Sequence, residues 1–361
     1  MKLLIQHGNL IDPVLNEERV MDILIENGQI AAIGAHLEDP EAQVLDASGM
    51  AVSAGLIDMH VHFRDPGFTE KEDIITGSRA AAHGGFTTVT CMPNTRPTVD
   101  SPEMVQYVYD RAKEGSGVHV LPIAVSMGEK GTVLTDAKAL KQAGAVALSD
   151  DGVPVQSANL MRDALICASR QQLAVLTHCE DADMVKNYAV NEGRISRQLG
   201  IPGRPAIAEE IMVMRDAMLA EETQTAVHIC HISTGRAVDI VRKYKKKGVK
   251  ITCETCPQYF TLNQREILEQ GAMARVNPPL RTSRDVAAVL AGVKDGTIDC
   301  IVTDHAPHTA EEKARGLEKA PSGMVGLETS LGITLTQLYH TGEMTLPEII
   351  AKMTVNPARI L

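Results

Sequence analysis

The sequence is poor in residues on which several classes of protein depend. It has no Trp and only four Phe among 361 residues, and its formal net charge is -11. A nucleic-acid-binding surface needs clustered basic side chains and stacking aromatic rings, so this composition argues against one. No apolar stretch approaches the roughly 20 residues that cross a bilayer, and the N-terminus has no signal-peptide pattern. We therefore expect a cytoplasmic protein with no membrane contact.

Cysteine is also scarce and scattered. The seven cysteines are odd in number, as expected of reduced thiols rather than of a secreted disulfide framework. Cys253 and Cys256, in "CETC", could form half a zinc site or a redox pair. No second pair follows, however, and side chains three apart on a strand face opposite sides. Structural cysteines are the favoured interpretation.

The chain does contain a regular alternation of short β-rich runs and longer helical runs. Eight such units follow one another from about residue 50, which predicts a (β/α)8 barrel rather than an open sheet. The expected strands are 51–63, 86–94, 118–128, 145–152, 173–181, 226–234, 249–262 and 298–308. The expected helices are 75–85, 101–115, 135–144, 158–172, 208–222, 235–248, 283–296 and 327–342.

Residues 1–50 differ from the rest, because strand-like alternation there is broken by Asn-Gly and Gly turns. We expect a small β unit over 1–50 and the barrel over 51–361. Such a unit cannot bury both faces alone, so it should need partner strands.

The stretch "DMHVHFRDPG" at 58–67 indicates a metal site at the end of the first barrel strand. His60 and His62 would project from the same face of that strand, with Arg64 beyond them. An isolated His-x-His is more often a pair of surface histidines. The other strand ends also carry metal-competent residues, and (β/α)8 enzymes hold their active sites there. These residues are Asp150, Asp151, His178, His231 and Asp304.

Each of these residues alone has an ordinary structural explanation, such as a turn for Asp150 and Asp151 or a core histidine for His231. Together, four histidines and two carboxylates from five strands fit two zinc-like ions that share ligands. Other histidines are expected at the surface or in packing: His7, His36, His83, His119 and His340. By strand parity, His228 and His305 should point away from the site, whereas Asp58 shares the face of His60 and could support it or cap a polar network.

An ordered set of motifs resembles the dihydroorotases of the amidohydrolase superfamily, of the bacterial long-chain type. The motifs run through nearly the whole chain: "DMHVHFRDPG", "MPNTRP", "LSDDG", "THCED", "CHIST", "NPPLR", "TDHAPH" and "APSGMVGLET". The resemblance implies a metal-dependent barrel flanked by a β-sandwich built from both termini. It also implies reversible closure of N-carbamoyl-L-aspartate to L-dihydroorotate in pyrimidine synthesis. Relatives continue past "NPARIL" to complete the sandwich, so we expect this sequence to be partial.

The resemblance also assigns the metal ligands. One zinc ion would take His60, His62, Asp151 and Asp304, and the other would take Asp151, His178 and His231. Asp151 would bridge the two ions, with Asp150 as the alternative. Many relatives use a carboxylated lysine as the bridge, but "AVALSDDG" contains no Lys.

Further roles follow from the same resemblance. A hydroxide between the metals would attack the ring carbonyl, and Asp304 would carry the proton as general acid and base. The substrate would contact His62, Arg64, Asn94, Asn277 and His308, together with the backbone of Ser322 and Gly323. Arg64 would bind the α-carboxylate.

Two other functions compete with this interpretation. A hydantoinase-like or allantoinase-like hydrolase would share the metal ligands, but the missing lysine and the set Arg64, Asn94 and His308 argue against it. A metal-free scaffold for aspartate transcarbamoylase would have lost ligands, and none is missing here. The partners implied are a small-molecule substrate, a second copy in a homodimer, and aspartate transcarbamoylase.

Overall fold

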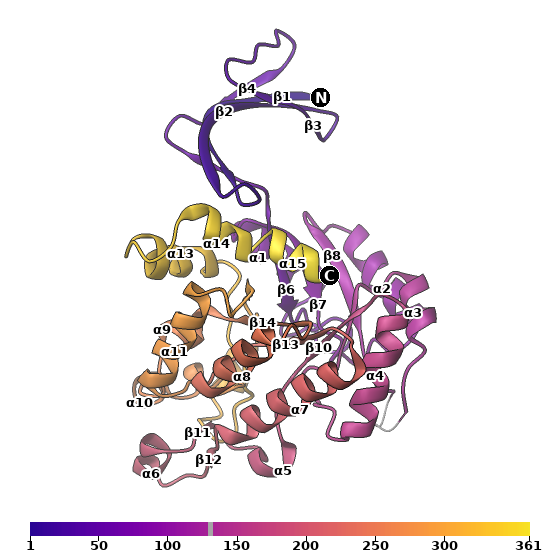
Figure 1. The fold of residues 1–361 in the computed structure, drawn as a ribbon, viewed down its shortest axis with the longest axis vertical. Helices are drawn as coiled ribbons and strands as arrows, with labels where there is room; N and C mark the ends of the chain where they lie inside the picture. The colour runs from indigo at the N-terminus through magenta and orange to yellow at the C-terminus, as the bar shows by residue number, and fades with distance from the viewer. Residues whose placement is uncertain (129–132) are drawn as a thin grey trace.

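The computed structural model describes residues 1–128 and 133–361, in which eight parallel strands form one sheet (Figure 1). The strands follow chain order, which confirms the predicted (β/α)8 barrel. A backbone hydrogen bond joins the segments that follow the first and last strands, from the N–H of His62 to the carbonyl of His305 over 2.8 Å. The strands are β6 (Leu56–Val61), β7 (Phe86–Cys91), β8 (His119–Ala124), β9 (Ala147–Ser149), β10 (Ala174–Thr177), β13 (Val227–Ile229), β14 (Ile251–Thr255) and β15 (Cys300–Ile301).

Helices cover the outside of the barrel, and the first seven predicted ones are present. They are α1 (Ile74–His83), α2 (Pro102–Lys113), α3 (Ala137–Ala143), α4 (Ala158–Arg170), α7 (Ile207–Thr223), α8 (Gly235–Lys246) and α11 (Ser283–Lys294). Several begin at a polar side chain that accepts a free backbone N–H, such as Asp73, Ser101 and Thr234. In the described parts of the chain, no helix has the length and apolar character needed to span a bilayer.

The eighth predicted helix, 327–342, is irregular. It consists of α13 (Ser330–Thr334) and a π-helical segment at Leu335–Tyr339, and α14 (Leu346–Lys352) and α15 (Val355–Ile360) follow. The hydroxyls of Thr336 and Thr341 donate to carbonyls four residues earlier, which weakens regular helix.

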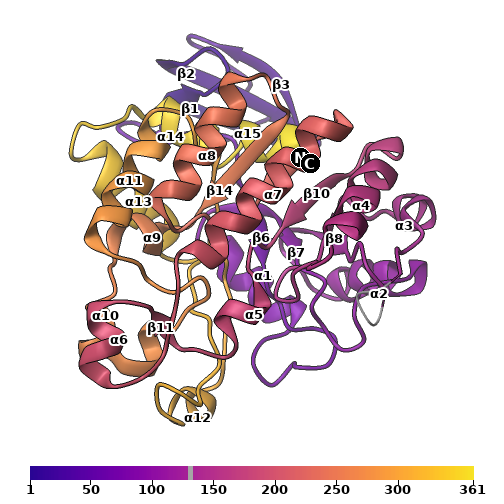
Figure 2. The ribbon, with the colours of Figure 1, turned by 60° about the horizontal axis from the view of Figure 1, so that its bottom comes forward.

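Short elements lengthen the loops after three of the strands. They are α5 (Ala182–Val185), β11 (Val190–Asn191), α6 (Arg194–Leu199), β12 (Gly203–Arg204), α9 (Pro257–Thr261), α10 (Glu266–Gln270), the 3-10 helix Gly271–Ala274, and α12 (Ala310–Lys313). Figure 2 shows α5, α6, α10 and α12 at one end of the barrel. These loops form the walls around the strand ends.

A separate β-sheet lies at the opposite end of the molecule (Figure 1). It contains β1 (Lys2–Asp12), β2 (Glu17–Glu26), β3 (Gln29–Gly34), β4 (Gln43–Asp46) and β5 (Ala51–Val52), in the order β3-β2-β1-β4 with β5 also beside β1. Asn27 and Gly28 join β2 to β3 with φ of 51° and 81°, as a type I′ hairpin turn requires. Among the described residues, Val20, Ile30 and Val44 of this sheet stay exposed.

Candidate functional site

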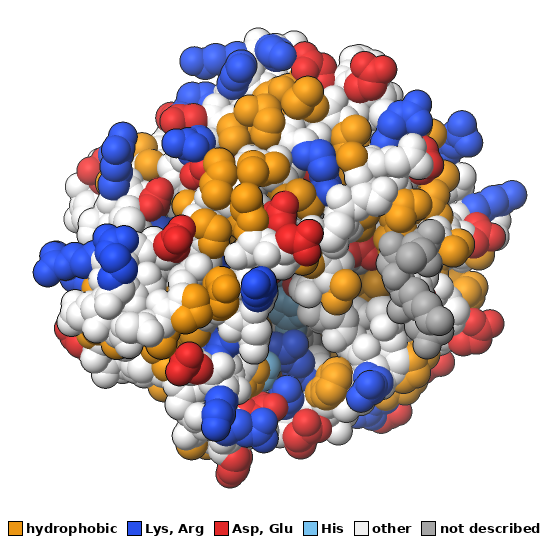
Figure 3. Space-filling view, turned by 90° about the horizontal axis from the view of Figure 1, so that it is seen from below, with side chains coloured by type: hydrophobic (Ala, Val, Ile, Leu, Met, Phe, Trp, Pro, Cys, Tyr) orange, Lys and Arg blue, Asp and Glu red, His pale blue; other side chains and the backbone are white. Residues whose placement is uncertain are grey.

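The candidate ligands lie at the ends of the barrel strands, on the face that carries the long loops. Figure 3 views the molecule from this side, and histidine side chains lie at the floor of a hollow with basic side chains beside them. A cleft of about 770 Å³ has Asn94 and Asp151 among its lining residues. The position is the one expected for the active site of a (β/α)8 enzyme.

His60, His62 and Asp304 converge on Asp151. The Nε2 atom of His60 lies 3.6 Å from Oδ1 of Asp151 and 3.5 Å from Oδ1 of Asp304. The Nε2 atom of His62 lies 3.4 Å from Oδ2 of Asp151 and 3.0 Å from Oδ1 of Asp304. All four side chains are buried. Two imidazole nitrogens and two carboxylates therefore surround one small volume.

His178 and His231 approach the same Asp151 carboxylate. The Nδ1 atom of His178 and the Nε2 atom of His231 each lie 3.2 Å from Oδ1 of Asp151, and 2.7 Å from each other. Asp151 is thus common to two groups with metal-ligand spacing, one with His60 and His62 and one with His178 and His231. This is the arrangement that a bridging carboxylate requires.

Asp150 points away from the histidines. Its carboxylate accepts hydrogen bonds from the Ser126 hydroxyl and from the backbone N–H of Met127. Strand β9 ends at Ser149, whose hydroxyl accepts the N–H of Asp151, and the chain then turns. Of the two adjacent aspartates, the geometry therefore favours Asp151 as the bridge.

The chemistry of this cluster fits divalent metal ions. Burial acts to raise the pKa of Asp151, but His60, His178 and His231 hold that pKa well below its usual range. Burial acts to lower the pKa of His178, yet the carboxylates of Asp151 and Glu180 raise it to about 10. Among the described residues, none hydrogen-bonds to the buried Nε2 of His60. A cation would supply the positive charge that the carboxylates favour and a partner for that nitrogen.

Three residues of the site adopt left-handed backbone conformations, which are unfavourable for any residue that carries a side chain. Arg64, His231 and Asp304 have φ of 54°, 30° and 50°. Such left-handed conformations cost about 1 to 3 kcal/mol each for residues other than glycine and cluster at functional sites. The surrounding barrel must therefore hold these three residues in place.

Arg64 and His308 lie together beside the ligands. Arg64 donates from Nε to the carbonyl of Pro307 over 3.3 Å, and one of its terminal nitrogens lies 3.4 Å from Nε2 of His308. The same Nε2 donates to the carbonyl of Ser322 over 2.9 Å. Burial, and then the charge of Arg64, lower the pKa of His308 to about 4, so the ring is neutral at pH 7. A buried cation and a neutral donor could together bind a carboxylate.

The other expected substrate residues have protein partners. The amide oxygen of Asn94 lies 3.0 Å from Nδ1 of His62, and the amide nitrogen of Asn277 lies 3.4 Å from Nε2 of His178. The N–H of Gly323 donates to the carbonyl of Arg275 over 3.0 Å. A side chain at position 323 would meet the carbonyl oxygen of Ala306 at 2.5 Å, so this close approach needs glycine.

Several polar residues that contact the site were not predicted from the sequence. Glu254 lies 2.5 Å from Nδ1 of His60, and Glu180 lies 3.8 Å from Nε2 of His178. Arg204 donates to both Glu180 and Asn277. The glutamate in the expected strand "VKITCETC" could have indicated a buried polar contact, but the prediction for this segment concerned only its two cysteines. Cys253 and Cys256 are both buried and free.

One parity prediction is wrong. His228 points into the barrel, where its Nε2 lies 3.1 Å from Glu254. Strand β13 ends at Ile229, and the positive φ of His231 breaks the alternation on which the prediction rested. His305 does point away, toward Glu72 at 3.0 Å. The histidines expected at the surface are all exposed, namely His7, His36, His83, His119 and His340.

The Asp58 carboxylate accepts hydrogen bonds from backbone N–H groups rather than from a histidine ring. It accepts the N–H of His60 over 3.0 Å and the N–H of Thr303 over 3.1 Å, which ties β6 to the residues just after β15. Burial raises its pKa to about 7 against these hydrogen bonds. Asp58 was expected either to support the His60 side chain or to cap a polar network, and its hydrogen bonds are those of a polar network.

Solved structures with the same fold are hydantoinases by name. L-Hydantoinase from Arthrobacter aurescens superposes with a TM-score of 0.88 at 23% identity, over 99% of this chain and 82% of that one. D-Hydantoinase from Thermus sp. superposes with a TM-score of 0.83 at 26% identity, over 99% of this chain and 81% of that one. These likenesses establish the barrel and its accompanying sheet.

The sequence comparisons are more specific. A family model described as Dihydro-orotase-like matches residues 49–237. The dihydroorotase of Acetivibrio thermocellus is 49% identical over 360 residues, which is 99% of this chain and 84% of that protein. The dihydroorotase of Pelotomaculum thermopropionicum is also 49% identical, over 100% of this chain and 84% of that protein. The chain therefore belongs to the dihydroorotase family.

Proposed function

We propose that this protein is a zinc-dependent dihydroorotase, which interconverts N-carbamoyl-L-aspartate and L-dihydroorotate in pyrimidine synthesis. The observation that carries the proposal is the shared carboxylate of Asp151, which lies within 3.6 Å of ring nitrogens from four histidines. The proposed ligands are His60, His62, Asp151 and Asp304 for one ion, and Asp151, His178 and His231 for the other. Zinc suits such nitrogen and oxygen donors.

Two bound zinc ions would lower the pKa of a water molecule and polarise the ring carbonyl. Asp304 is the proposed proton carrier, because its Oδ1 lies among the same ring nitrogens. In ring opening it would take a proton from the attacking water and deliver it to the departing amide nitrogen. In ring closure the proton would travel the other way. Closure removes a carboxylate and consumes a proton, so acid favours dihydroorotate.

Arg64 is the proposed partner of the substrate's α-carboxylate, and His308 would donate a second hydrogen bond to it. His308 would exchange its present acceptor, the carbonyl of Ser322, for the substrate. Asn94 and Asn277 would contact the ring from either side of the metal ligands, with the backbone of Ser322 and Gly323 closing the site. His62 would serve the substrate as well as the metal.

The competing hydrolase functions are not favoured. The relatives named dihydroorotase are 49% identical, whereas the hydantoinases are 23 to 26% identical and share the fold. A neutral ring such as that of dihydrouracil offers no carboxylate to Arg64. A scaffold without activity would have no need of six converging ligands.

The direct test is dihydroorotate hydrolysis by purified protein, with metal content measured on the same sample. We expect turnover together with stoichiometric zinc, and loss of both after chelation. Turnover of dihydrouracil or hydantoin in preference to dihydroorotate would contradict the proposed substrate. Full activity without a stoichiometric metal would contradict the proposed chemistry.

The domain boundaries and the binding partners of the chain are also proposals. We propose the β unit over 1–50 and the catalytic barrel over 51–361, although Ala51 and Val52 still pair with β1. The family resemblance supports a homodimer and a complex with aspartate transcarbamoylase. Sedimentation of the protein alone and with that enzyme tests both.

A further inference from the structure

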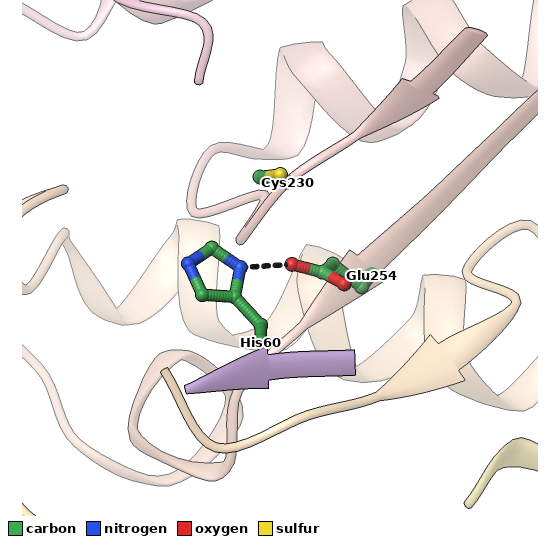
Figure 4. Close-up of side chains that lie close together, drawn as sticks. All are labelled: His60, Cys230 and Glu254. Carbon is green, nitrogen blue, oxygen red and sulfur yellow. Dashed lines mark hydrogen bonds and ion pairs between the residues drawn. The ribbon is translucent and has the colours of Figure 1, made fainter. Parts of the chain in front are cut away.

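Glu254 lies directly behind the metal ligand His60, inside the barrel. Figure 4 shows its carboxylate pointing at the His60 ring, and the contact from Oε1 to Nδ1 is 2.5 Å. Both side chains are completely buried. The residues come from β6 and β14, so this contact crosses the barrel interior.

The hydrogen bonds around Glu254 determine which ring nitrogen of each neighbouring histidine carries the proton. Its Oε2 lies 3.1 Å from Nε2 of His228, whose Nδ1 lies 2.8 Å from the hydroxyl of Thr252. The backbone N–H of His231 donates to Oε1 over 3.4 Å. An ionised carboxylate only accepts, so both rings must donate to it. The proton of His60 is then on Nδ1, which leaves the Nε2 lone pair facing Asp151 and Asp304.

A metal ion held by His60, Cys230 and Glu254 is a competing explanation, because their donor atoms lie close together. The other contacts of the carboxylate favour a hydrogen bond to His60, because Oε2 already faces Nε2 of His228 and Oε1 accepts the backbone N–H of His231. An ion at this place would be lost from Glu254→Gln while the affinity for the remaining zinc stayed unchanged, and that result would overturn the inference below.

Charge gives a second reason for a carboxylate at this position. Two zinc ions would bring four positive charges into a buried site, against the two negative charges of Asp151 and Asp304. Glu254 adds a third negative charge one imidazole ring away from the metals. Such a charge strengthens the ligand by making its ring nitrogen a better electron donor.

We propose that Glu254 is a positioning residue that holds His60 in its metal-binding tautomer and orientation, with His228 fixing the far side of the carboxylate. The inference rests on the proposed zinc-dependent function and adds a residue to the machinery of its metal centre. It acts through His60 and not through the substrate. Loss of Glu254 should therefore weaken metal binding before it changes any substrate contact.

The test compares zinc retention in three proteins by competition with a chromogenic chelator. Glu254→Gln keeps the size of the side chain and removes its charge, and we expect zinc affinity to fall about 10- to 100-fold. Asp216→Asn is the matched control, since Asp216 of α7 is also a fully buried carboxylate but contacts Arg215 and the Cys179 thiol instead of a proposed ligand. The control should keep the zinc affinity of the wild type. The thermal midpoints of the metal-free proteins report any general loss of stability.

Each outcome decides the inference. Wild-type zinc affinity in Glu254→Gln overturns it, and so does an equal loss in Asp216→Asn, which would indicate a general effect of barrel stability. If Glu254→Gln does not fold, Glu254→Asp keeps the charge but withdraws the carboxylate, and wild-type affinity there also overturns the inference. A wild-type protein that binds no zinc would defeat the proposed function as well. Zinc binding and dihydroorotate turnover in the wild type, with no change in the variants, would defeat the inference alone.

Discussion

Replacing Arg64 with Met should separate substrate binding from metal binding. The guanidinium lies among Pro307 and His308 and contacts none of the six proposed ligands through a hydrogen bond in the described structure. Burial lowers the pKa of Arg64 even though Asp304 and Asp151 oppose this, so the charge is held in a costly position. Methionine has an unbranched stem that fills similar space without the charge. Its backbone would keep the same left-handed conformation, so the variant changes the side chain alone.

The magnitude follows from the contact that is lost. A hydrogen bond to a charged group contributes about 1.5 to 3 kcal/mol, and each 1.36 kcal/mol is tenfold in rate. We therefore expect kcat/KM for dihydroorotate to fall about 10- to 150-fold. Arg64→Lys keeps the charge but lacks the planar fork, so its loss should be smaller.

The assay is steady-state hydrolysis of dihydroorotate, with zinc content measured beside it. Zinc should remain at the wild-type level, and any slow hydrolysis of a neutral cyclic amide should change little. Arg315→Met, which removes an exposed arginine from the loop after β15, controls for net charge. Normal kcat/KM in Arg64→Met, or a loss of zinc, would refute the role given to this arginine.

Four further results are expected. Asp304→Asn should lower kcat by about 10² to 10⁴ and weaken metal binding, and near-normal turnover with both metals present would remove Asp304 from the mechanism. Activity of a depleted and reconstituted enzyme should not depend on bicarbonate because Asp151 is the proposed bridge, and rescue by carbon dioxide would point to a carboxylated lysine. The pKa of His308 is lowered to about 4 from about 6.5 in an unfolded chain, so the unfolded state binds more protons in that window. The free energy of unfolding should therefore fall as the pH falls from 6.5 to 4, and His308→Gln should flatten this slope in urea titrations while leaving it unchanged above pH 7. Backbone amides of β3 and β4, at the edges of a sheet with exposed apolar side chains, should exchange faster than those of β6 to β8, and slow exchange there would contradict this.

The barrel could be predicted because its signal is repeated and local. Eight strand runs alternate with eight helix runs, and six of the helix runs end at glycine, so the pattern is indicated repeatedly along the chain. The barrel rule then brings the strand ends together without any knowledge of distances. His60, His178 and His231 were found in this way, and the structure places them around the carboxylate of Asp151.

What could not be predicted depends on single backbone angles or on contacts across the barrel. Asp150 and Asp151 are adjacent and identical in type, and the turn after Ser149 alone decides which one faces the histidines. His228 points into the barrel as an ordinary residue of β13, whereas His231 also reaches the site because the strand has ended and its φ is positive, which no strand pattern encodes. Glu254 is 194 residues from its partner His60, and nothing in its own segment indicates that contact.

The left-handed backbone at Arg64, His231 and Asp304 has a consequence for any effort to make this enzyme more thermostable. At each of these positions glycine would relieve about 1 to 3 kcal/mol of local strain. A redesign procedure that scores backbone strain alone would therefore favour replacing the proposed substrate partner, the proposed metal ligand and the proposed proton carrier. The resulting protein should lose its turnover. Libraries built for heat resistance should keep these three codons fixed, and spontaneous glycine variants at them should appear only where selection for pyrimidine synthesis has been lifted.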